Sequence, residues 1–290
     1  MKFCVIVNPY FDSEDYLYQA KRIKEEFNLR SIECDILNNK NFLARIENGN
    51  ISTKLDDYTA IIFWDKDKYL LEMLDRAGFK IFNSKDAIEV CDDKMMTYIA
   101  LTKNAIRMPK TLPGLLCFTK NAPISNETIN EIENAFKYPL IIKESFGSLG
   151  KSVYLIQNRD ELISKLEEVK CVPHLIQEYI ETSKGKDIRV IAIGGKAIGA
   201  MMRISNGDFR SNIGAGGSGI KVELDDEIIK ISNNIAQALG LDYCGIDLLL
   251  DKDGYSVCEV NSNAFFKTFE KATNINVASK YVDYILSKLN

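Results

Sequence analysis

The first 90 residues alternate between short apolar strands and amphipathic helices. KFCVIV, IECDIL, AIIFW and KIFN have the character of strands, and the helical segments EDYLYQAKRIKEEF and YLLEMLDRAG fall between them. Such alternation is typical of parallel strands joined by crossover helices, because a parallel connection must return along the sheet before the next strand begins. The pattern therefore predicts an α/β domain over residues 1–95.

The pattern changes beyond that point. Ser84 is a plausible N-cap for one long helical segment that ends before Met108-Pro109. Strands LLCF, PLIIKES, SVYLIQ and LIQEYI, with helices ETINEIENAF and RDELISKLEEV, then predict a small α+β unit over residues 96–180. A third part, residues 181–290, contains a hairpin turning at Gly194-Gly195, the helix DEIIKISNNIAQALG, a second hairpin and a last helix, ASKYVDYILSKL.

Composition limits the classes of function. The 290 residues are 46% hydrophobic and carry a formal net charge of −4, and a nucleic-acid binder would usually show a basic surplus instead. The opening MKFCVIVNPYF contains an apolar run of five residues that Asn8-Pro9 ends, and this run is too short for the apolar region of a signal peptide. No run approaches the roughly 18 apolar residues of a membrane helix. We therefore expect a cytoplasmic protein without nucleic-acid or membrane partners. The seven cysteines are dispersed along the chain, which is typical of reduced thiols rather than of disulfides or a zinc site. His174 is the single histidine, so the sequence argues against a histidine zinc site and against a Ser-His-Asp triad.

The stretch CGIDLLLDKDGYSVCEVNSN, residues 244–263, places acidic side chains inside a strand pair. If residues 252–254 form a three-residue loop, Asp251 faces Tyr255 and Asp247 faces Glu259. Asn261 shares the face of Glu259 because side chains alternate along a strand. Directly opposed like charges are destabilising, so the patch needs either a compensating Lys or Arg or a hard cation such as Mg²⁺. This stretch alone leaves both possibilities open.

Three glycine stretches invite motif readings. KESFGSLGKS, residues 143–152, lacks the earlier glycine of a P-loop and is followed by a strand, so it predicts a glycine hairpin in which Lys143 could meet a phosphate. GAGGSG, residues 214–219, is not preceded by a strand or followed directly by a helix, which argues against a dinucleotide fingerprint. In ETSKGKDIRV, Asp187 is either simply solvated or a partner for a ribose hydroxyl.

Taken together, DDK at 92–94, PLIIKESFGSLGKSVYL, LIQEYIETSKGKDIRV, GDFRSNIGAGG, GIDLLL and CEVNSN resemble the ATP-grasp superfamily, in particular the RimK-like α-L-glutamate ligases. These motifs occur in the family's order over about residues 90–262. The resemblance implies an ATP-grasp fold, α/β and α+β in class, with an N-terminal pre-ATP-grasp α/β domain that is Rossmann-like.

The resemblance also implies a role for each matching residue. ATP phosphates would meet Lys94 and Lys143 and lie under the loop that carries Gly147, Ser148 and Gly150. The adenine would be held by Glu178, Tyr179 and Ile180, and the ribose by Asp187. Arg189 and Arg203 would line the phosphoryl end, and Arg210, Ser211 and Asn212 would lie near ATP and the acceptor carboxylate. Arg203 and Arg210 would act in catalysis, and Asp247, Glu259 and Asn261 would hold Mg²⁺, with Mn²⁺ as an alternative ion.

The implied chemistry is a carboxylate–amine ligation. The γ-phosphoryl group of ATP would pass to a carboxylate and form an acylphosphate. The amino group of an amino acid, with glutamate as the expected one, would then attack the acylphosphate to form an amide or peptide bond. The acceptor would be a peptide, a protein tail or a small molecule. After CEVNSN the chain reads AFFKTFEKAT, whereas well-known members carry a small-residue, proline-containing turn there, so the acceptor stays open. A kinase on the same scaffold and a nucleotide-binding regulator without turnover are the alternative functions, and a homo-oligomer is a possible assembly.

Overall fold

The structure is a computed structural model that describes residues 1–11, 13–147, 150–205, 207–211 and 219–289. Its N-terminal sheet is parallel, with the strand order β2-β1-β5-β6. The strands are β1 (Lys2–Val7), β2 (Glu33–Asn38), β5 (Ala60–Trp64) and β6 (Ile81–Phe82), and the helices are α1 (Glu14–Leu29) and α2 (Lys68–Arg76). Every residue of β5 is buried, as expected for a parallel strand covered on both faces. The predicted α/β start is confirmed.

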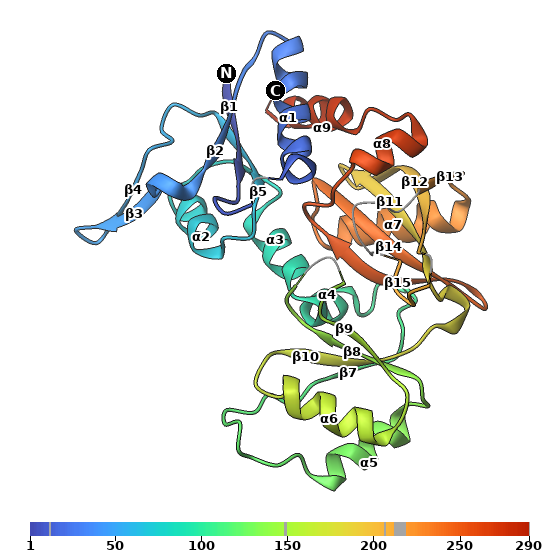
Figure 1. The fold of residues 1–290 in the computed structure, drawn as a ribbon. Helices are drawn as coiled ribbons and strands as arrows, with labels where there is room; N and C mark the ends of the chain where they lie inside the picture. The colour runs from blue at the N-terminus through green and yellow to red at the C-terminus, as the bar shows by residue number, and fades with distance from the viewer. Residues whose placement is uncertain (12, 148–149, 206, 212–218, 290) are drawn as a thin grey trace.

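Some N-terminal structure was absent from the prediction. A hairpin of β3 (Ala44–Glu47) and β4 (Asn50–Thr53) projects from the parallel sheet, and a short 3₁₀ turn, η1 (Asn39–Asn41), precedes it (Figure 1). The hairpin is only four residues long on each side, and its sequence ARIENGNIST shows little apolar alternation. Its turn residues, Asn48 and Gly49, both have positive φ, which is the turn chemistry that could have revealed it.

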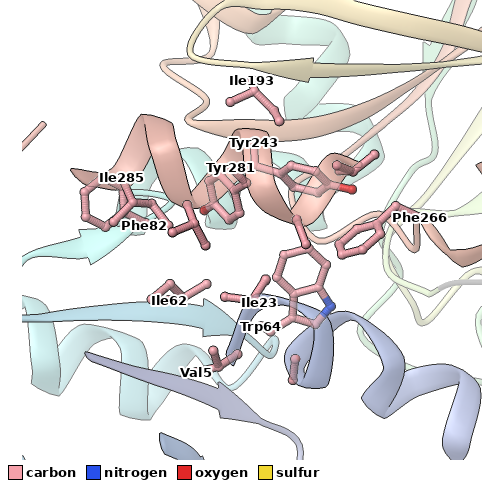
Figure 2. Packing of buried hydrophobic residues seen from close by; sticks show 14 of the residues in the cluster. Val5, Ile23, Ile62, Trp64, Phe82, Ile193, Tyr243, Phe266, Tyr281 and Ile285 are labelled. Carbon is pink, nitrogen blue, oxygen red and sulfur yellow. The ribbon is translucent and has the colours of Figure 1, made fainter. Parts of the chain in front are cut away.

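The C-terminal helices pack on the N-terminal sheet. The ring centroids of Trp64 and Phe266 lie 6.0 Å apart, and those of Trp64 and Tyr243 lie 5.2 Å apart. Tyr281, on α9 (Val277–Ser287), lies 5.1 Å from Tyr243. Figure 2 shows these rings gathered in one cluster with Val5 and Ile62 of the N-terminal strands. The two ends of the chain therefore share one hydrophobic core, which holds them against each other.

The segment predicted as one long helix is two helices. α3 (Lys85–Asp92) begins at the Ser84 cap as predicted, but α4 (Lys94–Leu101) is a separate helix. Asp93 between them leaves the helical conformation, with φ −101° and ψ 110°, and its carboxylate accepts from the backbone N–H groups of Met95 and Met96. An Asp that caps the following turn competes with continuation of the helix before it. The break places Lys94 at a helix start rather than in a helix interior.

The central part is an antiparallel sheet, with the strand order β7-β10-β8-β9, covered by two helices (Figure 1). Its elements are β7 (Thr111–Pro113), α5 (Asn126–Ala135), β8 (Leu140–Glu144), β9 (Val153–Ile156), α6 (Arg159–Val169) and β10 (His174–Glu178). The predicted strand LLCF was wrong: residues 115–118 form a loop, and Leu115 and Phe118 are exposed. The strand in this region is β7 instead, which pairs with β10. The glycine hairpin predicted at residues 143–152 is confirmed by the antiparallel pairing of β8 with β9.

The C-terminal part is built on a five-stranded antiparallel sheet of order β13-β12-β11-β14-β15. After η2 (Glu181–Ser183), its elements are β11 (Lys186–Ile193), β12 (Lys196–Ile204), β13 (Gly219–Val222), α7 (Asp226–Ala238), β14 (Tyr243–Asp251), β15 (Gly254–Asn261) and α8 (Lys267–Thr273), before α9. The turn at Gly194-Gly195 is confirmed, and both glycines have positive φ. β13 and α8 were absent from the prediction.

The acidic hairpin keeps the predicted partners but not the predicted turn. Asp251 faces Gly254 rather than Tyr255, so the loop is the two residues Lys252 and Asp253. A β-bulge at Cys258 adds one residue to β15, and beyond it Asp247 lies opposite Glu259 as predicted. The one-residue error at the turn is therefore cancelled by the bulge before the carboxylates are reached.

The length and hydropathy of the helices bear on whether the chain could cross a membrane. Across the described ranges, none of them is both long and apolar enough to span a bilayer. The cytoplasmic location stays a prediction.

Candidate functional site

A pocket lies between the central antiparallel sheet and the five-stranded sheet. It encloses about 860 Å³, part of which is open to solvent. Its walls come from β8, β9 and β10 on one side and from β11, β14 and β15 on the other. Many of the residues proposed from the sequence line it, namely Lys94, Lys143, Gly147, Gly150, Glu178, Tyr179, Ile180, Asp187, Arg210, Ser211 and Glu259. The fold thus brings together residues that are up to 165 positions apart in the chain (94 to 259).

Two lysines enter the pocket from different elements. Lys94 Nζ donates to the carbonyl oxygen of Gly147 at 3.0 Å and lies 3.8 Å from Oε1 of Glu259. Lys143 is buried, and its Nζ donates to Oε1 of Gln177 at 2.8 Å. Burial lowers the pKa of Lys94; Glu259 opposes that effect, whereas the charges of Lys66 and Lys143 add to it. A concentration of positive charge at this end of the pocket suits an anionic group such as a phosphate.

Apolar side chains from several elements also line the pocket. Ile141, Val153, Ile180, Phe209 and Leu249 contribute to its walls. The Tyr179 and Phe209 rings meet edge to face with centroids 6.5 Å apart. Glu178 Oε1 accepts from the backbone N–H of Lys110 at 2.9 Å, which fixes this side chain beside the strand end. An apolar slot with backbone polar groups at its rim is the usual setting for a planar base.

The floor next to the lysines is a row of ionic side chains on one face of the five-stranded sheet. Asp247 is 1% exposed and is held by Arg189, whose Nη2 lies 2.7 Å from Oδ2 and whose Nε pairs with Oδ1. Arg203 Nη2 lies 2.7 Å from the same Oδ2 and also pairs with Asp187. Ser211 donates to Asp187 as well. The compensating cations that the acidic hairpin required are therefore two arginines from β11 and β12.

The arginines control the ionisation of this buried row. Burial alone would raise the pKa of Asp247, but the neighbouring guanidinium groups of Arg189 and Arg203 outweigh it and lower that pKa. Burial likewise opposes the charge of Arg203, but Asp247 and Asp187 raise the pKa of Arg203 above its ordinary value. Asp247 and Arg203 are thus both charged at neutral pH, and the network is held by bidentate, charge-assisted hydrogen bonds.

Several residues proposed from the sequence lie beneath the pocket or outside the described chain. Arg189, Arg203 and Asp247 form the floor network and do not line the pocket itself. Asn261 lies two residues beyond Glu259 on the same face of β15, next to Gly245 of β14. Ser148 and Asn212 lie outside the described residues.

Other pocket residues were absent from the sequence prediction. Gln177, Phe209 and Cys258 all contact the cavity. Gln177 could have been found, because Lys143 faces Leu175 in the β8–β10 pairing and Gln177 is therefore its diagonal neighbour. Cys258 could not, because it enters the pocket through the β-bulge that shifts β15 by one residue.

The family to which this site belongs follows from comparison with known proteins. The family model described as the RimK-like ATP-grasp domain matches residues 91–285, which is more than half of the chain. The chain belongs to the RimK-like ATP-grasp family. This domain begins in α3 and ends in α9, so it contains every element that lines the pocket.

Two human relatives are similar in sequence to most of this chain. Beta-citrylglutamate synthase B of Homo sapiens is 31% identical over 290 residues, which covers 93% of this chain and 72% of that protein. N-acetylaspartylglutamate synthase A of Homo sapiens is 35% identical over 230 residues, which covers 78% of this chain and 57% of that protein. The prediction of an ATP-grasp carboxylate–amine ligase is confirmed at the level of the family.

A solved structure gives the same fold over nearly the whole RimK-like chain. The ATP-grasp ligase PsnB, complexed with minimal precursor, Mg and ADP, superposes with a TM-score of 0.70 at 18% identity, and covers 99% of this chain and 97% of that one. The predicted ATP-grasp fold, including its N-terminal α/β part, is therefore confirmed.

Proposed function

We propose that the protein is an ATP- and Mg²⁺-dependent ligase that joins the amino group of L-glutamate, or of a related amino acid, to a carboxylate of a peptide, protein or small-molecule acceptor. The observation that carries this proposal is the pairing of a cationic pocket end, Lys94 and Lys143, with the carboxylate of Glu259 at its floor. Both human relatives are named for products that contain glutamate, which supports glutamate as the amino acid.

ATP fits the shape and charge of the pocket. The base would lie in the apolar slot beside Tyr179 and Ile180, and the ribose near Asp187. The phosphates would extend toward Lys94 and Lys143 beneath the glycine hairpin that joins β8 and β9. Arg210 lines the same space, and its Nη1 donates to the carbonyl oxygen of Gly150 at 2.6 Å. Arg210 therefore connects its own loop to the hairpin over the phosphate end.

The residues at the floor fit a magnesium ion. Asp247, Glu259 and Asn261 offer oxygen donors on one face of β14 and β15, and oxygen is the ligand that Mg²⁺ prefers. Glu259 lines the pocket and has Lys94 as its nearest cation, at 3.8 Å. Asp247 already accepts from two guanidinium groups, but a carboxylate has about four lone-pair positions and can serve a metal as well. Among the described residues no cluster of three His, Cys, Asp or Glu side chains is arranged for a metal, so the set depends on Asn261 and on phosphate oxygens.

The chain's own groups suit phosphoryl transfer to a carboxylate. Such transfer needs positioned cations more than a strong base, and the pocket has no histidine in its lining. Bound Mg²⁺ would act as a Lewis acid on phosphate oxygens. Lys94, Lys143 and Arg210 would neutralise the charge that develops on the transferred group, and Arg203 would hold Asp187 and Asp247 in place from below. The acylphosphate formed would then be open to attack by the amine.

The decisive experiment measures ADP release across a panel of amino acids with metabolite and cell-extract acceptors. Without an added nucleophile such as hydroxylamine, a ligase sustains the release of ADP and phosphate only when amino acid and acceptor are both present, and the product gains the mass of one amino-acid residue. Hydroxylamine should trap the acylphosphate when the amino acid is left out. Replacing Mg²⁺ with Mn²⁺ in the same assay tests the alternative ion.

The same assay separates the competing functions. A kinase would leave phosphate on a hydroxyl of the acceptor, resistant to hydroxylamine, with no amino acid required. A nucleotide-binding regulator would bind ATP without acceptor-dependent turnover. Either result would overturn the ligase proposal.

A further inference from the structure

The N-terminal sheet contains a topological switch point that the nucleotide pocket does not use. From β1 the chain crosses through α1 to β2 on one side, and from β5 it crosses through α2 to β6 on the other side. The two connections leave the carboxyl ends of β1 and β5 in opposite directions. In open α/β sheets, ligands bind outside the carboxyl ends of the strands at such a point. The residues that follow β1 and β5 are Asn8 and Asp65.

Asp65 is a buried carboxylate with a free acceptor. The residue is 3% exposed. Its Oδ1 accepts from Asn8 Nδ2 at 3.0 Å and from the backbone N–H of Lys66 at 2.7 Å. Its Oδ2 has no hydrogen-bond partner in the part of the chain that the structure describes. A buried carboxylate oxygen without a partner is costly, and burial raises the pKa of Asp65. An ammonium group would supply the missing donor and the opposite charge.

Lys66, the next residue, turns toward the ligase site. Its Nζ lies 2.5 Å from Oδ1 of Asp92, which ends α3 one residue before the Asp93 cap of the Lys94 helix. Burial lowers the pKa of Lys94 and Glu259 opposes that effect, and the positive charge of Lys66 lowers the same pKa further. Lys66 is therefore within electrostatic range of the phosphate end of the pocket, and its partner Asp92 lies at the start of the matched RimK-like domain, residues 91–285.

The carboxyl edge of the N-terminal sheet is fixed against the end of the β14–β15 hairpin, which carries the residues proposed to hold magnesium. Asn83, directly after β6, is buried, and its Nδ2 donates to the carbonyl oxygens of Tyr243 and Ser262, both at 2.8 Å. Its Oδ1 accepts from the backbone N–H of Tyr243, also at 2.8 Å. Ser262 directly follows Asn261, so these hydrogen bonds hold the switch-point edge beside the floor of the proposed magnesium site.

We propose that the carboxyl ends of β1 and β5 form the subsite for the amino-acid substrate, in which Asp65 Oδ2 receives the α-ammonium group and Lys66 receives a carboxylate. The zwitterion matches the adjacent acidic and basic side chains in sign. Asn8 is a positioning residue, because its amide holds Oδ1 of Asp65 and leaves Oδ2 for the ligand. This inference rests on the proposed function, since it assigns the amino acid of that reaction to a place in the fold.

The test compares the binding of L-glutamate with that of glutarate, which lacks only the amino group. Isothermal titration calorimetry is carried out on the full chain saturated with Mg²⁺ and a non-hydrolysable ATP analogue. Asp65→Asn keeps the size of the side chain and an oxygen for Asn8, so it should fold normally. We expect it to weaken L-glutamate binding about 10- to 100-fold and to leave glutarate binding unchanged. Lys66→Gln should weaken both ligands, and Lys68→Gln, at an exposed residue that begins α2, should weaken neither.

Each other result counts against a specific claim. Unchanged L-glutamate binding in Asp65→Asn would overturn the subsite, and so would an equal loss for both ligands, because that pattern indicates a structural role. If the unaltered protein neither binds L-glutamate nor ligates any amino acid, the proposed function fails and the subsite with it. If ligation of L-glutamate is found but Asp65→Asn binds it normally, the subsite alone is wrong.

Discussion

Arg203 lies 2.7 Å from Asp247, measured from Nη2 to Oδ2, and the same guanidinium group pairs with Asp187. The two carboxylates come from different strands, β14 and β11, and both are almost completely buried. One side chain from β12 thus connects the position proposed for the ribose with the position proposed for the metal. The positive charge of Arg203 offsets the cost of burying two carboxylates at this floor.

Replacing Arg203 by Met should destabilise the protein strongly. Asp187 would lose its guanidinium partner, and Asp247 would keep only Arg189. Removing one member of a buried ionic group typically costs about 3–5 kcal/mol of unfolding free energy. Urea unfolding followed by the fluorescence of Trp64, the single tryptophan, measures this loss. The matched control is Arg159→Met, whose ion pair with Glu133 is partly exposed and should contribute less than about 1 kcal/mol. Equal losses in the two variants would contradict the role given to the buried network.

Glu259→Gln should abolish Mg²⁺-dependent turnover without unfolding the protein. The carboxylate lines the pocket, and its nearest ion-pair partner, Lys94, is 3.8 Å away, so its loss costs little stability. Loss of a charged metal ligand should lower kcat by about 100-fold or more. The control, Asp253→Asn, removes an exposed carboxylate at the tip of the same hairpin and should leave kcat and its Mg²⁺ dependence unchanged. Normal activity of Glu259→Gln at limiting Mg²⁺ would rule out the metal assignment.

Lys143→Met should weaken ATP binding while the apolar stem of the side chain is retained. Lys143 is buried, and its Nζ is held by Gln177, so the charge is already directed at the pocket. A charge-assisted contact to phosphate is typically worth about 1.5–3 kcal/mol, which corresponds to roughly 10- to 150-fold in Kd. Titration with a fluorescent ATP analogue measures the change, and Lys137→Met, an exposed residue ahead of β8, serves as control. An unaltered ATP affinity in Lys143→Met would show that this lysine does not contact the nucleotide.

The sequence predicts the site best where alternation along strands applies. Asp247 and Glu259 share a face, as expected, and so do Asp187 and Arg189 on β11. The same alternation places Arg203 opposite Asp187 once β11 and β12 are paired. The prediction nevertheless missed the ion pairs themselves, because the pairing of β11 with β14 joins segments about 60 residues apart and no local pattern reveals it.

Local chemistry that competes with a regular element explains the remaining errors. The helical pattern of residues 84–105 continues through Asp93, so the sequence predicts one helix there. In the structure the carboxylate of Asp93 caps α4, and α3 ends before it. The bulge at Cys258 leaves no mark in CEVN, so the turn and the strand were each misjudged by one residue. LLCF has the composition of a strand, but the shorter Thr111–Pro113 occupies the edge of β10, and Leu115 and Phe118 remain exposed. Strand pairing, rather than propensity, decided the last two cases, and a local side-chain cap decided the first.

Glu26→Gln should reduce stability at neutral pH and weaken its dependence on acid. Glu26, on α1, accepts from Arg22 and Arg30, both at 2.8 Å, and from Asn276, the N-cap of α9, at 2.7 Å. Burial opposes its ionisation, but Asn276, Arg30 and Arg22 outweigh it and lower its pKa from 4.5 to about 2. Because the pKa is lower in the folded state, the stabilisation is complete above the unfolded value near 4.5 and is lost as the pH falls toward 2. Unfolding free energies measured from pH 7 to pH 2 should therefore fall less steeply below pH 5 in Glu26→Gln than in the unaltered protein. The control is Glu25→Gln, which removes an exposed neighbour, and parallel curves for Glu26→Gln and the unaltered protein would refute the assignment.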